Sequence, residues 1–127
     1  MLFSTLVAFL ATGLFGFLWF SPNVFGNQWM KLVGKTADQL MNKERTMAVG
    51  LSVTLLMNLA IGVLVKWIGL NNFLESLQFT VVAGLGIAVM TTATNFVWEQ
   101  RSLNLFLIYA GHILGVVFIS ALIYTYM

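Results

Sequence analysis

Four long apolar segments, separated by polar or turn-forming residues, constrain this chain more than any other feature of its sequence. They run over about 2–20, 47–70, 74–98 and 103–126. Each reaches the roughly 20 apolar residues that an α-helix needs to cross the hydrocarbon core of a bilayer. A helix satisfies its own backbone hydrogen bonds in lipid, whereas a lone strand leaves them unpaired. The segments therefore predict an all-α integral membrane protein with four transmembrane helices, formed as a single domain over 1–127.

The composition agrees with lipid as the main solvent of the chain. Hydrophobic residues make up 60% of the 127 residues and charged residues only 8%. A soluble domain of this length leaves too much surface in water to hide so many apolar side chains. Six basic residues are too few to follow a nucleic-acid backbone, so we expect no nucleic-acid partner, and the absence of cysteine excludes thiol chemistry. The first segment lacks a basic start and exceeds the apolar part of a signal peptide, so we expect it to be retained as a span.

The connections between the spans differ in length and in charge. The first, 21–46, is long, and the other two are a few residues each, which predicts an up-and-down series for the last three helices. Five of the six basic residues lie in the first and third connections. Cytoplasmic loops carry such an excess of Lys and Arg, so we expect 21–46 and 99–102 in the cytoplasm and both termini outside. The five are Lys31, Lys35, Lys43, Arg45 and Arg101, and the sixth, toward the other face, is Lys66.

The stretch WFSPNVFGNQW, residues 19–29, ends the first span in an unusual cluster. The residue before a proline is pushed out of the helical conformation, so the span ends there and Ser21 is placed to cap a new turn. Gly26 can end that turn, and NQWMKLV follows with apolar residues at helical spacing. We therefore predict a short amphipathic helix over about 27–33, lying on the cytoplasmic surface of the membrane. The residues of this interface turn are Ser21, Pro22, Phe25, Gly26 and Trp29.

Tryptophan and tyrosine side chains stand at or beside the ends of the predicted spans. The amphipathic rings of these residues favour the headgroup level of a bilayer. We interpret them as interfacial anchors. They are Trp19, Trp29, Trp67, Trp98, Tyr124 and Tyr126.

Two stretches resemble the signatures of a known family. LFGFLWFSPNVFGNQWMKLVG, residues 14–34, has an aromatic-Ser-Pro followed by Phe-Gly and Trp. TTATNFVWEQRSLNLFLIYAGHILG, residues 91–115, has an Asn near a helix end followed by Glu and an Arg-Ser pair. Together they resemble a widespread bacterial family of small membrane proteins catalogued as a domain of unknown function (DUF1761). The resemblance implies four transmembrane helices in the bacterial inner (plasma) membrane, no established activity, and no catalytic residue to carry over.

Small and polar residues recur three or four positions apart within the spans, which places them on one face of each helix. Two explanations stay open. Small residues let helices approach closely in lipid, where polar side chains hydrogen-bond across the contact. Alternatively, polar side chains inside a membrane mark a solute or ion path. We assign Gly50, Gly62, Gly84, Gly111 and Gly115 to helix packing, and Asn58, Asn95, His112, Thr54, Thr91 and Glu99 to a possible polar path.

No arrangement of residues in the sequence indicates catalysis or a metal site. Asn58 is the leading path candidate because it falls near the middle of the second span, and His112 lies about ten residues into the last. One histidine cannot form a metal site, and the four acidic residues lie at helix ends or in connections, so we expect no metal and no cofactor. Without a nucleophile–base pair or deep paired carboxylates, an enzyme is the least expected class.

Two functions from different classes remain, each with the lipid bilayer as partner. The leading specific prediction is a small channel or carrier for an anion, a proton or a neutral solute. Four short helices enclose little space, so its path would run between the subunits of a homo-oligomer. The alternative is an accessory, assembly or lipid-interacting protein that acts through its cytoplasmic interfacial segment, with another membrane protein as a possible partner.

Overall fold

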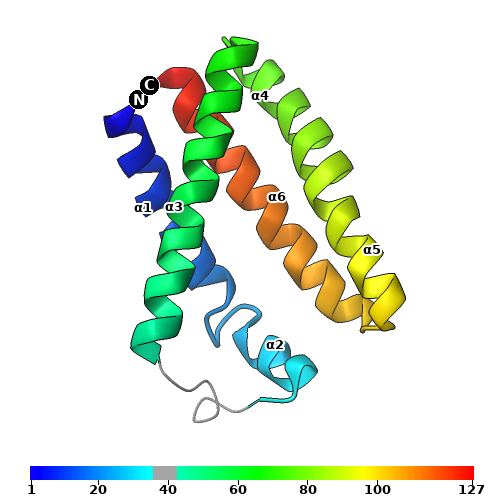
Figure 1. The fold of residues 1–127 in the computed structure, drawn as a ribbon. Helices are drawn as coiled ribbons and strands as arrows, with labels where there is room; N and C mark the ends of the chain where they lie inside the picture. The colour runs from blue at the N-terminus through cyan, green and yellow to red at the C-terminus, as the bar shows by residue number, and fades with distance from the viewer. Residues whose placement is uncertain (36–42) are drawn as a thin grey trace.

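The computed structural model describes residues 1–35 and 43–127, and these form helices joined by turns, without a strand in the described part. Three of the elements follow one another without a break and form a single rod: α4 (Phe73–Phe79), η2 (Thr80–Val89) and α5 (Met90–Glu99) (Figure 1). Its middle section, η2, is a π-helix. In chain order the elements are α1 (Leu2–Trp19), α2 (Gly26–Val33), α3 (Lys43–Ile68), α4 (Phe73–Phe79), η2 (Thr80–Val89), α5 (Met90–Glu99) and α6 (Leu103–Tyr126).

Four helical rods in the described residues are long and apolar enough to cross a membrane, so the predicted four-span, all-α fold is confirmed. They are Leu2–Trp19, Glu44–Ile68, Phe73–Glu99 and Leu103–Tyr126. The second span begins a few residues before the predicted start, and the third is slightly longer at both ends. The expected single domain over 1–127 includes seven residues, 36–42, that lie outside the described part.

Local sequence explains the tight turn between the second and third spans. Gly69 takes a φ of 80°, a left-handed conformation that ends a helix and suits glycine. Asn72 then caps α4, because its Oδ1 accepts a hydrogen bond of 2.9 Å from the N–H of Glu75. The Glu75 carboxylate accepts in return from the N–H of Asn71, at 2.6 Å. This reciprocal arrangement satisfies backbone donors that a helix start leaves unpaired.

The turn after α1 forms differently from the prediction. The Ser21 hydroxyl donates to the carbonyl of Leu18, 2.7 Å away at the end of α1, so it does not cap a new turn. The backbone carbonyl of Ser21 accepts instead from the N–H groups of Val24 and Gly26, at 3.0 and 2.8 Å. Gly26 is the first residue of α2, and a Cβ there would overlap the carbonyl oxygen of Phe20. Gly26 is therefore needed for the close approach of two backbone segments.

Helix α6 is the centre of the molecule. It packs against α1 and α3 on one side and against α4 and η2 on the other. α3 and the α4–η2–α5 rod make little contact with each other, so they diverge along their length (Figure 1). The two chain termini lie side by side at one end of the bundle, and α2 lies at the opposite end, near the α5–α6 turn (Figure 1). The fold is thus a three-helix unit of α1, α3 and α6 with the third span attached through α6.

Candidate functional site

A buried polar cluster joins the three helices of this unit. The Asn58 side chain, on α3, has no exposed surface. Its amide nitrogen donates to the Thr12 hydroxyl on α1 and to the Thr54 carbonyl, each at 2.9 Å, and its amide oxygen accepts from Ser120 on α6 at 2.7 Å. Both N–H groups of the amide are therefore used, and the oxygen is occupied. A satisfied amide of this kind holds helices together in lipid, where an unpaired one is costly.

The other five residues assigned to a polar path do not gather around Asn58 in the structure. Of those five, only Thr54 is hydrogen-bonded to Asn58. Thr91 and Asn95 are exposed on the surface of α5, and the Thr91 hydroxyl donates to the carbonyl of Ile87, one turn earlier in the same rod. Glu99 is exposed at the end of α5. A continuous polar route through these side chains is therefore not formed within the described part of one chain.

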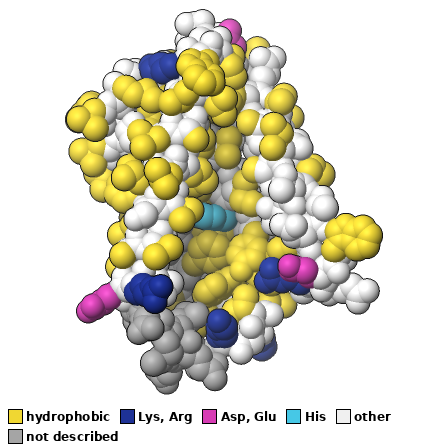
Figure 2. Space-filling model, in the orientation of Figure 1, with side chains coloured by type: hydrophobic (Ala, Val, Ile, Leu, Met, Phe, Trp, Pro, Cys, Tyr) yellow, Lys and Arg dark blue, Asp and Glu magenta, His cyan; other side chains and the backbone are white. Residues whose placement is uncertain are grey.

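His112 lies among aromatic rings where α1 meets α6. Its imidazole is parallel to the ring of Phe15, with an interplanar angle of 2° and centroids 5.7 Å apart. The ring of Phe20 approaches it edge-on at 5.1 Å. A Cβ on Gly16 would come 3.0 Å from its Nε2 atom, so a glycine makes room for the ring. The half-buried histidine is visible, in cyan, at the bottom of a hollow in the molecular surface (Figure 2).

Four of the five glycines assigned to helix packing lie in close contacts between helices. A Cβ at Gly62 or Gly111 would come 2.5 Å from the ring of Tyr124 or Trp19, respectively. A Cβ at Gly115 would meet the ring of Phe15, and a Cβ at Gly84 would lie close to the side chains of Leu114 and Val117. The fifth glycine, Gly50, is exposed, and the position of a Cβ there has no neighbouring atom within 4 Å.

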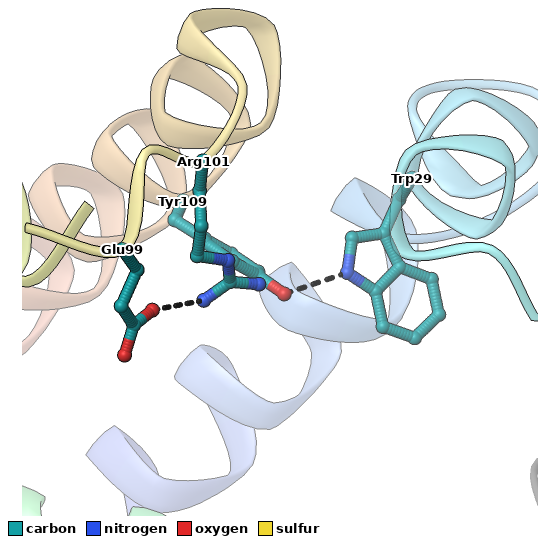
Figure 3. Close-up of polar contacts among 4 residues, drawn as sticks. All are labelled: Trp29, Glu99, Arg101 and Tyr109. Carbon is teal, nitrogen blue, oxygen red and sulfur yellow. Dashed lines mark hydrogen bonds and ion pairs between the residues drawn. The ribbon is translucent and has the colours of Figure 1, made fainter. Parts of the chain in front are cut away.

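The aromatic residues of the stretch 19–29 attach α1 and α2 to α6. The indole N–H of Trp19 donates to the carbonyl of Ile108 at 2.9 Å, and that of Trp29 donates to the hydroxyl of Tyr109 at 3.0 Å (Figure 3). The ring of Phe20 packs against both Trp29 and Tyr109, with centroid distances of 5.5 Å and 6.3 Å, respectively. Hydrogen bonds and ring contacts thus fix the amphipathic α2 on the bundle.

This arrangement corrects part of the anchor interpretation. Tyr124 is fully buried, with its hydroxyl donating to Thr5 at 2.9 Å, so it is not an interfacial anchor. Trp19 and Trp29 are half-buried and hydrogen-bonded to α6, which leaves part of each ring at the surface. Trp67 and Trp98 remain 81% and 83% exposed, as residues at the surface of a membrane protein would be. A ring at a helix end can face either lipid or a neighbouring helix, and sequence position alone does not distinguish the two.

A pocket of about 490 Å³ opens between α2 and the α5–α6 turn. Two cationic side chains, Lys35 and Arg101, are among its lining residues. Arg101 is held over the ring of Phe96, with its guanidinium carbon 4.5 Å from the ring centroid. Its Nη1 atom is 3.6 Å from Oε2 of Glu99 (Figure 3). The remaining walls come from Trp29, Leu32, Val33, Ser102, Leu105 and Tyr109.

A second pocket, of about 540 Å³, lies at the other end of the bundle, where α3 ends and α4 begins. Its walls are mainly apolar and include Leu64, Phe79 and Val82. Among the described residues, no three His, Cys, Asp or Glu side chains gather as metal ligands would. The pocket with two cations is therefore the more distinctive chemical feature, and we regard it as the candidate site.

Sequence reasoning missed three partners that define these sites. Ser120 and Tyr109 lie in the last span, and nothing in their local sequence marks them as partners of Asn58 and Trp29. Thr12 is a small polar residue of the first span, and its spacing gives a face but no partner. The sequence indicates only weakly that Lys35 and Arg101 share one pocket, since both belong to the connections with excess positive charge.

The comparisons with known proteins give one match. A family model described as Protein of unknown function (DUF1761) matches residues 3–125, which is nearly the whole chain. No curated protein and no solved structure matches.

Proposed function

The chain belongs to the DUF1761 family, and we propose that it is a non-catalytic, multi-pass membrane protein that interacts with lipid through its interfacial segment. The observation that carries this proposal is the attachment of α2 to α6. The hydrogen bond of 3.0 Å from Trp29 to Tyr109 holds α2 at the end of the bundle where α1 and α5 end and α6 begins. An amphipathic helix at this level meets the boundary between headgroups and acyl chains.

The proposal includes an orientation and a compartment. Lys31, Lys35 and Arg101 belong to the end of the bundle that carries α2, and Lys66 belongs to the other end. The excess of positive charge supports a cytoplasmic location for α2, and the family resemblance supports the bacterial inner membrane. The cytoplasmic leaflet is rich in anionic lipid in many membranes, and basic residues are attracted to it.

The test uses the full chain extracted with its surrounding lipid. Native mass spectrometry of the wild type should find discrete bound lipids. Trp29→Phe keeps an apolar ring but removes the N–H that bonds Tyr109, and it should lower the fraction of lipid-bound protein. Trp98→Phe is the matched control, because Trp98 is 83% exposed. A wild type free of lipid, or equal losses in both variants, would contradict the proposal.

A second candidate is a carrier or channel formed between copies of this chain. It is supported by the shape of the molecule, since α3 and the third span leave a hollow open between them (Figure 2). It is also supported by Thr91 and Asn95, which are polar and exposed on α5. The native mass in lipid tests it first. A monomer would rule it out, and an oligomer would justify measuring the flux of anions and protons into liposomes.

A further inference from the structure

The pocket between α2 and the α5–α6 turn combines a charged rim with apolar walls. Lys35 follows α2, and Arg101 lies in the turn, so the two cations reach the pocket from different segments. Trp29 and Tyr109 are joined by their hydrogen bond and stiffen the wall between α2 and α6. The volume of about 490 Å³ is within the range of sites that hold small molecules.

The pocket has hydrogen-bond donors that the protein does not use up. Arg101 has five N–H donors, and its ion pair with Glu99 is long, at 3.6 Å, and exposed. The contact with the ring of Phe96 fixes the guanidinium in place without using a donor. Ser102 is the N-cap of α6, but its hydroxyl makes no capping hydrogen bond. No ion pair joins Lys35 to another residue in the described part of the chain.

The position of the pocket indicates which kind of anion it binds. It lies where α1 and α5 end and α6 begins, which is the level of the lipid phosphates for helices of this length. Leu32 and Leu105 form an apolar wall beside the cations. A free phosphate gains nothing from such a wall, whereas the glycerol and upper acyl chain of a lipid pack against it.

We infer that this pocket binds the phosphate of an anionic lipid headgroup through Lys35 and Arg101, with the lipid's apolar part against Leu32 and Leu105. The inference rests on the proposed function and names its ligand class. Arg101 donates two parallel N–H groups to the phosphate oxygens, Lys35 supplies a point charge, and the Ser102 hydroxyl donates a third contact.

The experiment compares affinities for phosphatidylglycerol and phosphatidylcholine, measured by native mass spectrometry on the full-length protein. The double variant Lys35→Gln, Arg101→Gln should lose roughly 30-fold in affinity for phosphatidylglycerol, since each basic residue at such a surface contributes about fivefold. Its helical content should match the wild type and its thermal unfolding should change little, because both side chains are exposed and the surface contacts of Arg101 with Phe96 and Glu99 are weak. The matched control is Lys31→Gln with Arg45→Gln, which removes the same charge from exposed positions at the same end, outside the pocket.

The possible outcomes distinguish failure of the pocket inference from failure of the broader proposal that the protein interacts with lipid. A selective loss in the pocket variant supports the inference. An equal loss in the control variant means that general charge attraction holds the lipid, which overturns the pocket but leaves the lipid interaction in place. Competition by inorganic phosphate without any preference for phosphatidylglycerol overturns the lipid as ligand. A wild type that retains no lipid overturns the proposed function itself.

Discussion

The ring of Tyr124 lies directly against Gly62, so closely that a Cβ at Gly62 would come within 2.5 Å of two ring atoms. Tyr124 is fully buried, and its hydroxyl reaches Thr5 on α1. One glycine therefore allows the last helix to pack on the second span and to hydrogen-bond the first. This contact lies one helical turn beyond the Thr12–Asn58–Ser120 cluster, and the two layers together fix the three-helix unit.

Gly62→Ala should destabilise the protein. The added methyl group overlaps an aromatic ring that is enclosed on all sides, and overpacking of this kind costs about 1–3 kcal/mol. Gly50→Ala, on the same helix, is the control, because open space surrounds the Cβ position there. Thermal unfolding in lipid nanodiscs measures both, and equal midpoints would show that the Tyr124 contact is not tight.

Asn58→Leu should also lower stability, by about 1–2 kcal/mol. The substitution removes the hydrogen bonds to Thr12 and Ser120, and interhelical bonds in membranes contribute about 0.6 kcal/mol on average and up to about 1.7. Asn95→Leu, at an exposed position, should leave the unfolding midpoint nearly unchanged. If Asn58→Leu were as stable as the wild type but reduced a measured flux, the amide would belong to a path after all.

Gly111→Leu with Gly115→Leu should separate α1 from α6. The rings of Trp19 and Phe15 occupy the space that the leucines would need. We expect a lower unfolding midpoint and a changed fluorescence of Trp19, whose indole N–H loses its bond to Ile108. The native mass should stay the same, because these contacts are within one chain. A changed mass with an unchanged midpoint would assign the two glycines to an interface between copies.

Glu99→Gln should raise the affinity for phosphatidylglycerol by a few-fold. The Glu99 carboxylate is the ion-pair partner of Arg101, and without it the guanidinium is free to bind the lipid phosphate. Stability should change little, since exposed pairs contribute about 0–1 kcal/mol. The difference from the wild type should shrink as salt is added. An unchanged or weaker affinity would mean that Arg101 does not contact the headgroup.

Part of the site could be read from the sequence, and part could not. The Ser-Pro break and the amphipathic helix after it follow from local backbone rules, so α2 was placed to within one residue. The two connections with excess Lys and Arg meet at the end of the bundle that carries the pocket. The sequence did not show that Lys35 and Arg101 share a pocket, nor that Trp29 is bonded to Tyr109, because both pairings join segments that are far apart in the chain.

The sequence by itself determined the number of spans, their approximate ends and the all-α fold. These depend on the transfer of each segment from water to lipid and on local capping, which are properties of neighbouring residues. Only the tertiary structure decided which helices touch. Gly50 and Gly62 belong to the same stripe on α3, yet one is open and the other lies against Tyr124. The difference arises because packing depends on the shapes of two helix surfaces at once, and α6 meets α3 at Gly62 but not at Gly50.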